Sequence, residues 1–372
     1  MDLSLEEKAR RYGLVRNELQ KRGLAGLLIF SNAQINQQGF VRYFTDLPIP
    51  IYAHSILFLP EDGAYLFTPS PLQTYWAKKR SWIPADRIKL SRDAGHEMGT
   101  LIAGMKKENG TFGVVSFDTM CAKDYRALMT FCPNLQLVDG TPLLEDVRRQ
   151  KSAEELALVR LSADIALLSQ RVVRQEMKKG CSEEELCAKV EEAVRHHGAE
   201  RTFYLVSSSP GGFYPYAPGP QRLDGTSPVL FSTEVSGPGG YWTQIVRTFF
   251  WKKPEGRSMD MYHALTDIME MAQRELRAGQ KIAGVAEKMR TIIHERGFEY
   301  GVHFGHGLGL DVVEEPLINT MNERVLLPGQ IVTVHPHVID ERESIGIWLG
   351  DTYLIEADQT VNLTAYLPQD FR

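Results

Sequence analysis

The second half of the chain repeats one order of elements, and this order constrains the fold more than any other feature. Ser152 followed by Glu155 forms a capping box that opens a long helical segment, and Ser182 with Glu185 opens another. Strand-like runs follow, then two helices between about residues 258 and 297, then further strands. This order predicts an internally duplicated α+β unit.

The first 147 residues have a different pattern of apolar and polar residues. Short apolar runs bounded by turn residues predict buried strands, beginning with residues 23–32. Residues 54–69 predict a hairpin that turns at residues 61–63, and residues 125–132 predict a helix between strands. Because 372 residues are many for one hydrophobic core, we expect two domains, an α/β domain at 1–147 and an α+β domain at 148–372.

Composition excludes several classes of partner. A formal charge of -5 gives no positive field for nucleic acid or for an anionic membrane surface. No segment is typical of a secretory signal or a membrane span. The four cysteines show no CxxC spacing and predict reduced thiols. We therefore expect a cytoplasmic protein that acts on a small molecule.

Three segments of the second domain resemble the creatinase, prolidase and methionine aminopeptidase superfamily. Residues 239–251 are similar to its Asp-x-x-Arg-Thr-Phe strand, residues 303–316 to its GHGxGLxxHExP loop, and residues 326–338 with 345–356 to its last two motif strands. Residues 39–46 and 54–63 resemble the creatinase-type N-terminal domain. The resemblance implies a pita-bread fold for 148–372, a creatinase/prolidase N-terminal domain for 1–147, and a homodimer.

The resemblance also implies where metals would bind. Metallopeptidases of the superfamily hold two divalent ions with two Asp, one His and two Glu, and the matching positions here are Thr233, Gln244, His306, His335 and Gly350. Only His306 is retained, and hard divalent ions need carboxylates. Glu234 lies beside Thr233, but neighbouring strand residues point to opposite faces, so we expect it to face away. We predict no metal and no cofactor.

Three residues are candidates for catalysis. His306 and His335 stand at former ligand positions, and an imidazole can exchange a proton near neutral pH. Glu314 is retained from the family's Val-His-Glu motif, whose His is Val313 here. His335 and His337 are expected to share one face of one strand.

Further residues are candidates for substrate contact. Aromatic rings near the site could enclose a cationic nitrogen, and Arg42, in a loop that reaches the partner's active site in creatinase-like dimers, could anchor a carboxylate. Singly, each aromatic could instead be an ordinary core residue and each imidazole a structural one. The predicted substrate-binding set is Arg42, Tyr214, Tyr216, Trp242, Gln244, His303, His337 and Trp348.

Three functions are open from the sequence. The favoured one is a metal-independent, creatinase-like hydrolase that cleaves a carbon–nitrogen bond in a small metabolite. However, residues 207–222, where creatinase carries its catalytic His, contain none. The alternatives are a non-catalytic binding member of the superfamily, and an Xaa-Pro dipeptidase or aminopeptidase whose atypical metal ligands include His306, His335 and Glu234.

Overall fold

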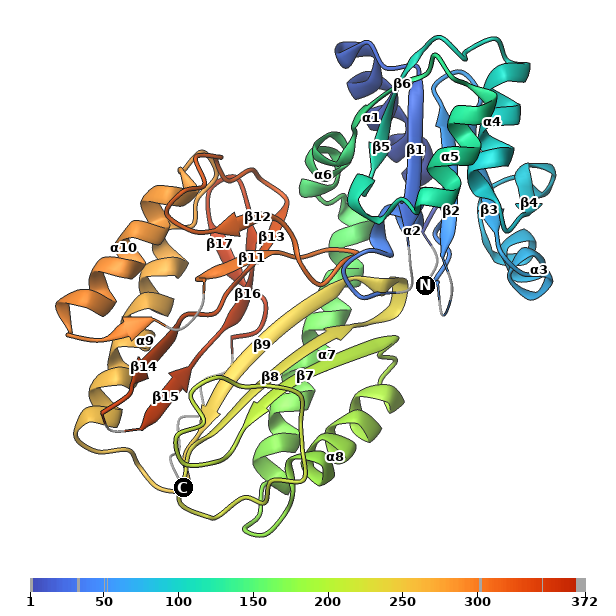
Figure 1. Cartoon of the computed structure of the whole chain (residues 1–372). Coiled ribbons are helices and arrows are strands. Elements are labelled where there is room, and N and C mark those ends of the chain that lie inside the picture. Colours follow the sequence, from blue (N-terminus) through green and yellow to red (C-terminus); the bar gives the residue numbers. More distant parts are fainter. Residues whose placement is uncertain are drawn as a thin grey trace. The chain divides into compact units, whose positions relative to one another are not determined.

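The computed structural model describes residues 3–31, 34–49, 51, 53–300, 303–342 and 344–365. The chain divides into two compact units, Met1–Arg148 and Arg149–Arg372, and each has its own sheets and helices (Figure 1).

The first unit is built on a six-stranded mixed sheet in the order β4-β3-β2-β1-β5-β6. β1 (Gly26–Ser31) pairs antiparallel with β2 (His54–Leu59) and parallel with β5 (Thr111–Val115). The predicted hairpin is confirmed, because β2 turns after Leu59 into β3 (Gly63–Thr68). The other elements are β4 (Ile88–Leu90), β6 (Gln136–Asp139), α1 (Leu5–Arg22), α2 (Gly39–Thr45), α3 (Pro71–Arg80), η1 (Ala85–Arg87), α4 (Ala94–Gly104), η2 (Phe117–Thr119), α5 (Ala122–Phe131) and α6 (Thr141–Arg149).

The core of this unit lies between one face of the sheet and the pair α4 and α5. Leu28, Leu57 and Phe112 project from the central strands onto Met98 and Leu128 of the two helices, and all five are fully buried. Alternate residues of a strand point to one face, so these strands each present an apolar row to the helices.

Four long helices of the second unit begin and end close to the predicted positions. α7 (Ala153–Glu176) and α8 (Glu183–His196) start at complete capping boxes, in which Ser152 and Ser182 accept from the amides of Glu155 and Glu185 and the glutamates accept in return. α9 (Arg257–Glu275) and α10 (Ile282–Glu295) follow. Their predicted order along the chain is confirmed.

The first sheet of this unit is an antiparallel hairpin with one added strand. It contains β7 (Arg201–Ser207), β8 (Val229–Ser236) and β9 (Trp242–Phe249), with η3 (Pro238–Gly240) in the β8–β9 turn. Phe231, Val235 and Ile245, all at odd-numbered positions, pack into the core that α7 and α8 form. Leu230 and Val246, at even-numbered positions, instead pack against Trp348 on the other face.

The remaining strands form two further antiparallel sheets, of five and three strands, beside α9 and α10 (Figure 1). The five-stranded sheet has the order β12-β11-β13-β16-β17 and the three-stranded sheet the order β10-β14-β15. Their bounds are β10 (Glu299–Tyr300), β11 (Gly305–Gly307), β12 (Glu314–Ile318), β13 (Gln330–Val334), β14 (His337–Asp340), β15 (Ile345–Trp348), β16 (Asp351–Ile355) and β17 (Thr360–Asn362).

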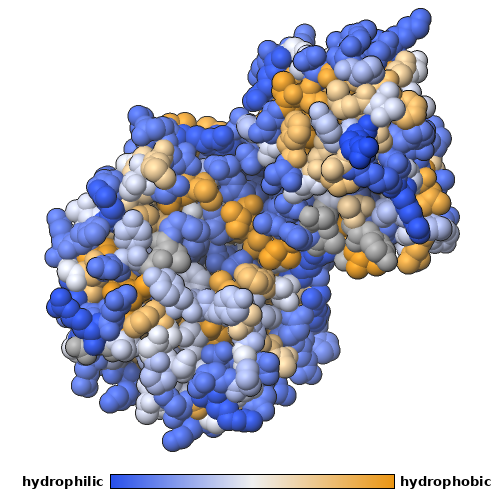
Figure 2. Space-filling view, in the orientation of Figure 1, coloured by the Kyte–Doolittle hydropathy of each residue, from blue (hydrophilic) through white to orange (hydrophobic). Residues whose placement is uncertain are grey.

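The face of each unit that is visible in Figure 2 is mostly polar. Figure 2 shows hydrophilic side chains over most of the visible face, with apolar groups in small patches. None of the helices in the described ranges is both long enough and apolar enough to cross a lipid bilayer.

Candidate active site

Three imidazoles gather where β11 and β13 lie side by side. His303 precedes β11, His306 lies in it, and His335 follows β13. The ring centroids are 5.8 Å apart for His303 and His306, 5.1 Å for His303 and His335, and 5.2 Å for His306 and His335. His306 and His335 are buried and His303 is exposed, so the cluster meets solvent at His303.

Hydrogen bonds determine which ring nitrogens of these histidines remain available as proton donors or acceptors. His306 Nδ1 lies 2.9 Å from the carbonyl oxygen of Gly307. In a neutral ring Nδ1 carries the hydrogen and donates it there, which leaves the Nε2 lone pair available. Neither ring nitrogen of His335 has a hydrogen-bond partner among the described residues. Burial lowers the pKa of His306 to about 4 and that of His335 well below its usual value, so both rings are neutral at pH 7.

His337 joins the cluster from another sheet. The prediction that His335 and His337 share one strand is wrong, because Pro336 separates β13 from β14 and the two strands belong to different sheets. Both rings nevertheless contact Trp348, with centroids 5.7 and 5.8 Å from its ring. The indole nitrogen of Trp348 donates to the carbonyl oxygen of His335 at 2.7 Å, and Tyr214 meets the ring of His337 edge-on at 5.8 Å.

Glu234 is a buried carboxyl that the sequence analysis placed on the wrong face. It lies directly across from Gln244 on the neighbouring strand, and Gln244 Nε2 donates to its Oε1 at 3.1 Å. Thr233, which we had matched to the first metal position, points toward α7 and accepts from Ser169 and Gln170. Alternation along the strand holds as expected, but Thr233 is the residue that faces the helices.

Glu234 and Gln244 lie on the face of β8 and β9 that packs against Trp348, the same face as Leu230 and Val246. His306 pairs with Thr333, and Thr333 pairs with Thr352, so their side chains form one row across β11, β13 and β16. The hydroxyl of Thr352 accepts from the backbone amide of Gln244 at 3.0 Å and donates to its carbonyl oxygen at 2.8 Å. The row that begins at His306 therefore ends on β9 at Gln244.

Gly350 brings His335 against β9. Its backbone exchanges two hydrogen bonds with Val246, at 3.0 and 2.9 Å. A Cβ at this position would stand 2.6 Å from His335 Cβ and 3.0 Å from a methyl group of Val246. Arg247 and Asp351 form a buried ion pair of 2.7 Å next to it. The absence of a side chain at Gly350 is thus what lets the segment that carries His335 approach β9.

Burial gives Glu234 an unusual protonation state. Its side chain is buried next to Gln244, and desolvation raises the pKa of Glu234 to about 8. Most molecules therefore carry a proton on this carboxyl at neutral pH. A group that gains or loses a proton near pH 7 is suited to acid–base catalysis. The sequence analysis named Glu234 only as an atypical metal ligand in an alternative function, because the pairing of β8 with β9 was not known.

The structure describes the surroundings of four other predicted site residues. The carboxylate of Glu314 pairs with the Lys151 ammonium at 3.0 Å and accepts from the Asp311 amide at 3.3 Å, in a buried setting. Trp242 is fully buried, and Tyr216 is 79% exposed. Arg42 lies buried in α2 of the first unit, so the prediction that it sits in a loop is wrong.

The dinuclear metal site that the resemblance implies does not fit the side chains present. Gly350 offers no donor, Thr233 is turned toward α7, and Glu234 is largely uncharged at neutral pH. Two hard divalent cations at close quarters need several carboxylates. In the described part of the chain, no three His, Cys, Asp or Glu side chains are arranged to hold a metal ion.

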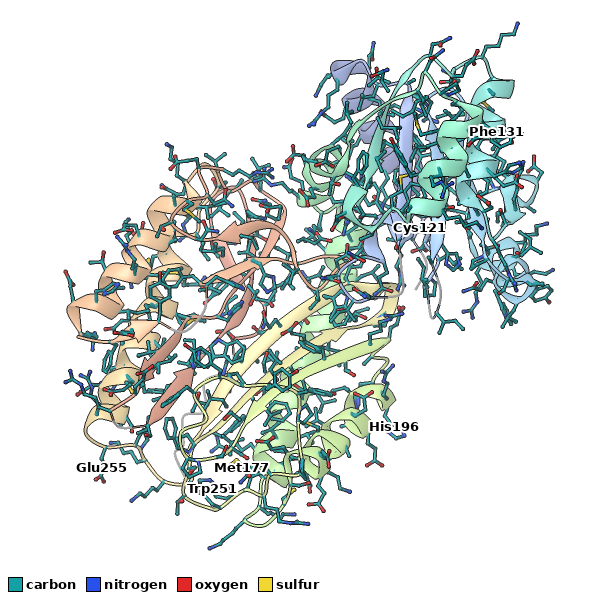
Figure 3. The ribbon with its side chains drawn as sticks, viewed as in Figure 1. Cys121, Phe131, Met177, His196, Trp251 and Glu255 are labelled. Atoms are coloured by element: carbon teal, nitrogen blue, oxygen red, sulfur yellow. The ribbon has the colours of Figure 1, made fainter. Side chains whose placement is uncertain are left out.

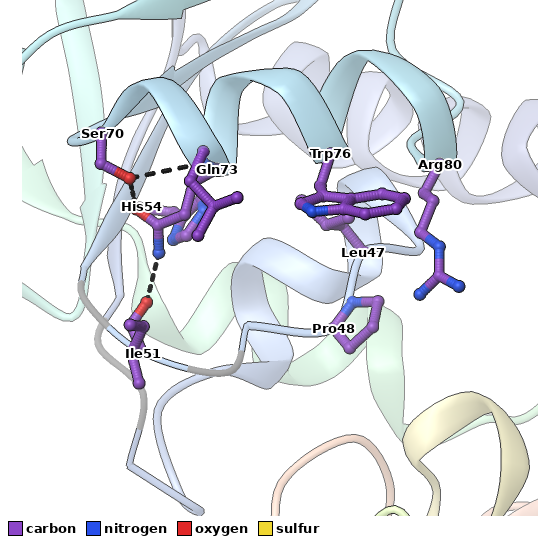
Figure 4. A pocket seen from close by; sticks show the side chains of 9 residues that line it. Leu47, Pro48, Ile51, His54, Ser70, Gln73, Trp76 and Arg80 are labelled. Atoms are coloured by element: carbon purple, nitrogen blue, oxygen red, sulfur yellow. Dashed lines mark hydrogen bonds between the residues drawn. The ribbon is translucent and has the colours of Figure 1, made fainter.

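A separate pocket of about 430 Å³ lies in the first unit and is mostly apolar (Figure 4). Trp76 of α3 faces Leu47 and Pro48 across it, with Arg80 at one end. At the other end Gln73 bonds to Ser70 and to the carbonyl oxygen of Ile51. The pocket holds few groups that could exchange protons, so we place the candidate active site in the second unit.

Two family models match successive parts of the chain. Residues 157–357 match the metallopeptidase family M24, and residues 11–150 match the creatinase/prolidase N-terminal domain. The chain is 22% identical to an Xaa-Pro dipeptidase of Pyrococcus furiosus over 342 residues, which is 89% of this chain and 95% of the relative. It is 24% identical to the uncharacterized peptidase YqhT of Bacillus subtilis over 74% of each chain.

Solved structures share the fold over nearly the whole chain. The prolidase of Pyrococcus horikoshii superposes with a TM-score of 0.83 at 22% identity, covering 96% of this chain and 99% of that one. The X-Pro aminopeptidase of Thermotoga maritima gives 0.83 at 18% identity, covering 97% and 98%. The predicted two-domain creatinase/prolidase fold and the expectation of a hydrolase-type enzyme are confirmed. The chain belongs to metallopeptidase family M24.

Proposed function

We propose that this chain hydrolyses a carbon–nitrogen bond of a small substrate as an Xaa-Pro dipeptidase-like enzyme. The observation that carries the proposal is a buried carboxyl with a raised pKa, Glu234, on the face of its sheet that packs against Trp348, whose ring contacts the imidazole of His335. Membership of a peptidase family supports the reaction class. The names of the relatives favour Xaa-Pro substrates over a creatinase-like reaction.

The chain's own side chains can carry the protons of such a reaction. Water oxygen bonds to the carbonyl carbon while its proton passes to the free nitrogen of His306 or to His335. The carbon–nitrogen bond then breaks as the leaving nitrogen takes the proton of Glu234. The imidazolium returns its proton to the Glu234 carboxylate, so one water is consumed and the protein ends unchanged. General acid–base assistance of this kind contributes roughly 10²- to 10⁴-fold in rate.

Substrate contacts in this proposal come from the groups around the imidazoles. His303 stands at the solvent side, Tyr214 and Trp348 flank His337, and Gln244 holds Glu234. We leave Glu314 out because its carboxylate is already paired with Lys151. Arg42, Tyr216 and Trp242 remain predictions as substrate contacts, as do a homodimer and a cytoplasmic location.

A second candidate function is hydrolysis of the same Xaa-Pro substrates with the help of one bound metal ion. One metal ion held by His306, His335 and Glu234 would supply Lewis-acid chemistry, but the described side chains are not arranged to hold a metal ion, so these three would first have to move. The family's description favours it.

Hydrolysis of Ala-Pro by protein prepared in EDTA separates these candidates. The proposal expects turnover in EDTA and a loss of roughly 10²- to 10⁴-fold in kcat for Glu234→Gln. His196→Ala is the matched control, because His196 lies exposed at the end of α8 (Figure 3). Turnover that appears only after Mn²⁺, Co²⁺ or Zn²⁺ is added would establish the second candidate, and no hydrolysis of Xaa-Pro dipeptides under either condition would contradict both.

A further inference from the structure

The pocket of the first unit has the size and shape of a small-molecule site. It encloses about 430 Å³ beside α3, and sites for small ligands typically measure roughly 300–1,000 Å³. Trp76 forms one wall, and Leu47 with Pro48 forms the wall across from it (Figure 4). A stable protein partner needs an interface of about 800 Å² on each side, which a hollow of this size does not provide. The pocket therefore suits a small occupant.

The walls of the pocket favour a flat, apolar occupant. Trp76 is 48% exposed and Leu72, at the same pocket, is 64% exposed, so much of their apolar surface is in contact with water. An indole face binds a second planar group by offset stacking. A flat ring system placed between Trp76 and the opposite wall would remove apolar area of both molecules from water, which is the main source of affinity in such sites.

One charged side chain, Arg80, stands at an end of the pocket (Figure 4). Its guanidinium carbon lies 5.4 Å from the centroid of the Trp76 ring. Among the described residues the Arg80 side chain has no hydrogen bond and no ion pair, and no acidic residue lines the pocket. A guanidinium presents a planar fork of N–H donors that matches a carboxylate. The charge at this end is thus complementary to an anion.

The opposite end of the pocket has already used its polar groups. The side chain of Gln73 accepts from the hydroxyl of Ser70 at 3.2 Å and donates to the carbonyl oxygen of Ile51. The hydroxyl of Ser70 in turn accepts from the amide of Gln73, as the cap of α3. The polar group of an occupant therefore belongs at the Arg80 end, with its apolar body extending over Trp76.

We propose that this pocket binds a small monocarboxylate with a flat apolar body. The body lies between Trp76 and the wall of Leu47 and Pro48, and the carboxylate pairs with the guanidinium of Arg80. The proposal is independent of the reaction proposed above, because all of these residues belong to the first unit. The chain then carries a ligand site in addition to its candidate active site.

Calorimetric titration of the full chain with three probes tests the proposal. 2-Naphthylacetate has both features of the ligand, 2-naphthylacetamide has the flat body without the charge, and acetate has the charge without the body. We expect the amide to bind about fivefold more weakly than the acid, because the pairing is with an exposed arginine. We expect acetate to give no measurable binding at the same concentrations. Equal affinities of the acid and the amide would overturn the proposal.

Variants of the two contact residues assign the binding to this pocket. Trp76→Ala should weaken 2-naphthylacetate at least about tenfold, as expected for a stacking aromatic. Tyr125→Ala is its control, because Tyr125 is an exposed aromatic of α5 in the same unit. Arg80→Met keeps the aliphatic stem and should bring the acid down to the affinity of the amide. Lys79→Met is the control for charge, because Lys79 is exposed in the same turn of α3 and does not line the pocket.

The variants also give the results that contradict the proposal. Unchanged binding in Trp76→Ala would place the probe elsewhere, and equal losses in Arg80→Met and Lys79→Met would show a general effect of charge. If Trp76→Ala does not fold, Arg80→Met still decides, because Arg80 is exposed. Absence of 2-naphthylacetate binding would overturn the proposal as well. A sedimentation coefficient that differs between the parent and Trp76→Ala would then assign the pocket to a contact between copies of the chain.

Discussion

Glu234 keeps its proton because its surroundings are dry rather than because another acid lies close. Burial alone accounts for the rise of its pKa from 4.5 to about 8, and the hydrogen bond from Gln244 does not reverse it. A neutral carboxyl in this place acts as a hydrogen-bond donor as well as a proton source. The residue thus adds a second chemical function to a site that otherwise contains neutral imidazoles.

Glu234→Gln is expected to change how the free energy of unfolding depends on pH. The folded protein holds this proton up to about pH 8, whereas the unfolded chain releases it near pH 4.5. Stability is therefore greatest below pH 4.5 for this group and falls, by an amount on the order of a few kcal/mol, as pH rises to 8. Urea titrations from pH 5 to 8 should show a smaller fall for the Gln variant. Parallel curves for the two proteins would contradict the assigned protonation state.

The histidines should produce the opposite dependence at acidic pH. The pKa of His306 and that of His337 are lowered to about 4 in the folded protein, while the unfolded chain takes up protons near pH 6.5. Stability from these groups is full above pH 6.5 and is lost as pH falls toward 4. We expect His337→Phe to melt with a shallower loss of Tm between pH 6.5 and 4 than the parent, measured by circular dichroism. His196→Phe, at an exposed position, should follow the parent.

At the scale of elements, the close approach between β9 and the segment that carries His335 depends on Gly350. Gly350→Ala would bring a new Cβ to 2.6 Å from His335 Cβ, a distance that requires the backbone to shift. Overpacking of this kind costs about 1–3 kcal/mol. We expect a lower free energy of unfolding in urea together with a displaced His335 imidazole resonance in NMR spectra. An unmoved resonance would show that the segment adapts without displacing the ring.

The capping box of α7 should contribute measurably to the free energy of unfolding. Ser152→Ala removes the acceptor for the Glu155 amide and should lower the free energy of unfolding by about 1 kcal/mol. Ser182→Ala makes the same change at α8 and should cost a similar amount. Chemical denaturation of both variants checks the expectation, and a cost well below this in both would argue against these caps.

Local signals predicted the helices and the hairpin well, whereas the site required knowledge of pairing. Ser152, Ser182 and the turn at residues 61–63 act through neighbours a few residues away, which a sequence displays directly. The face of Glu234 depends on which residue of β9 lies opposite, and that register is set by contacts distant in sequence. The histidine cluster was predicted through the resemblance, but the break at Pro336 that separates two sheets was not.

At the scale of the whole molecule, we expect hard metal ions to leave the melting temperature of the protein unchanged. A ligand that binds the folded state at a hundred times its Kd stabilises it by about 2.7 kcal/mol. Because the described residues do not form a carboxylate-rich site, we expect no rise in Tm on addition of Mn²⁺ and no fall in EDTA, measured by scanning calorimetry. A clear rise with Mn²⁺ would contradict the neutral character that we assign to the site.

The contact of Gly350 with His335 and Val246 also limits how this protein could be converted by design. His335 and a methyl group of Val246 occupy the space that a side chain at position 350 would need, so the difference from a carboxylate-rich centre lies in the main chain as well as in the side chains. A glutamate grafted at position 350 would therefore require the backbone around His335 to shift. A successful conversion has to transplant the whole strand crossing at residues 335–351, with its own spacing.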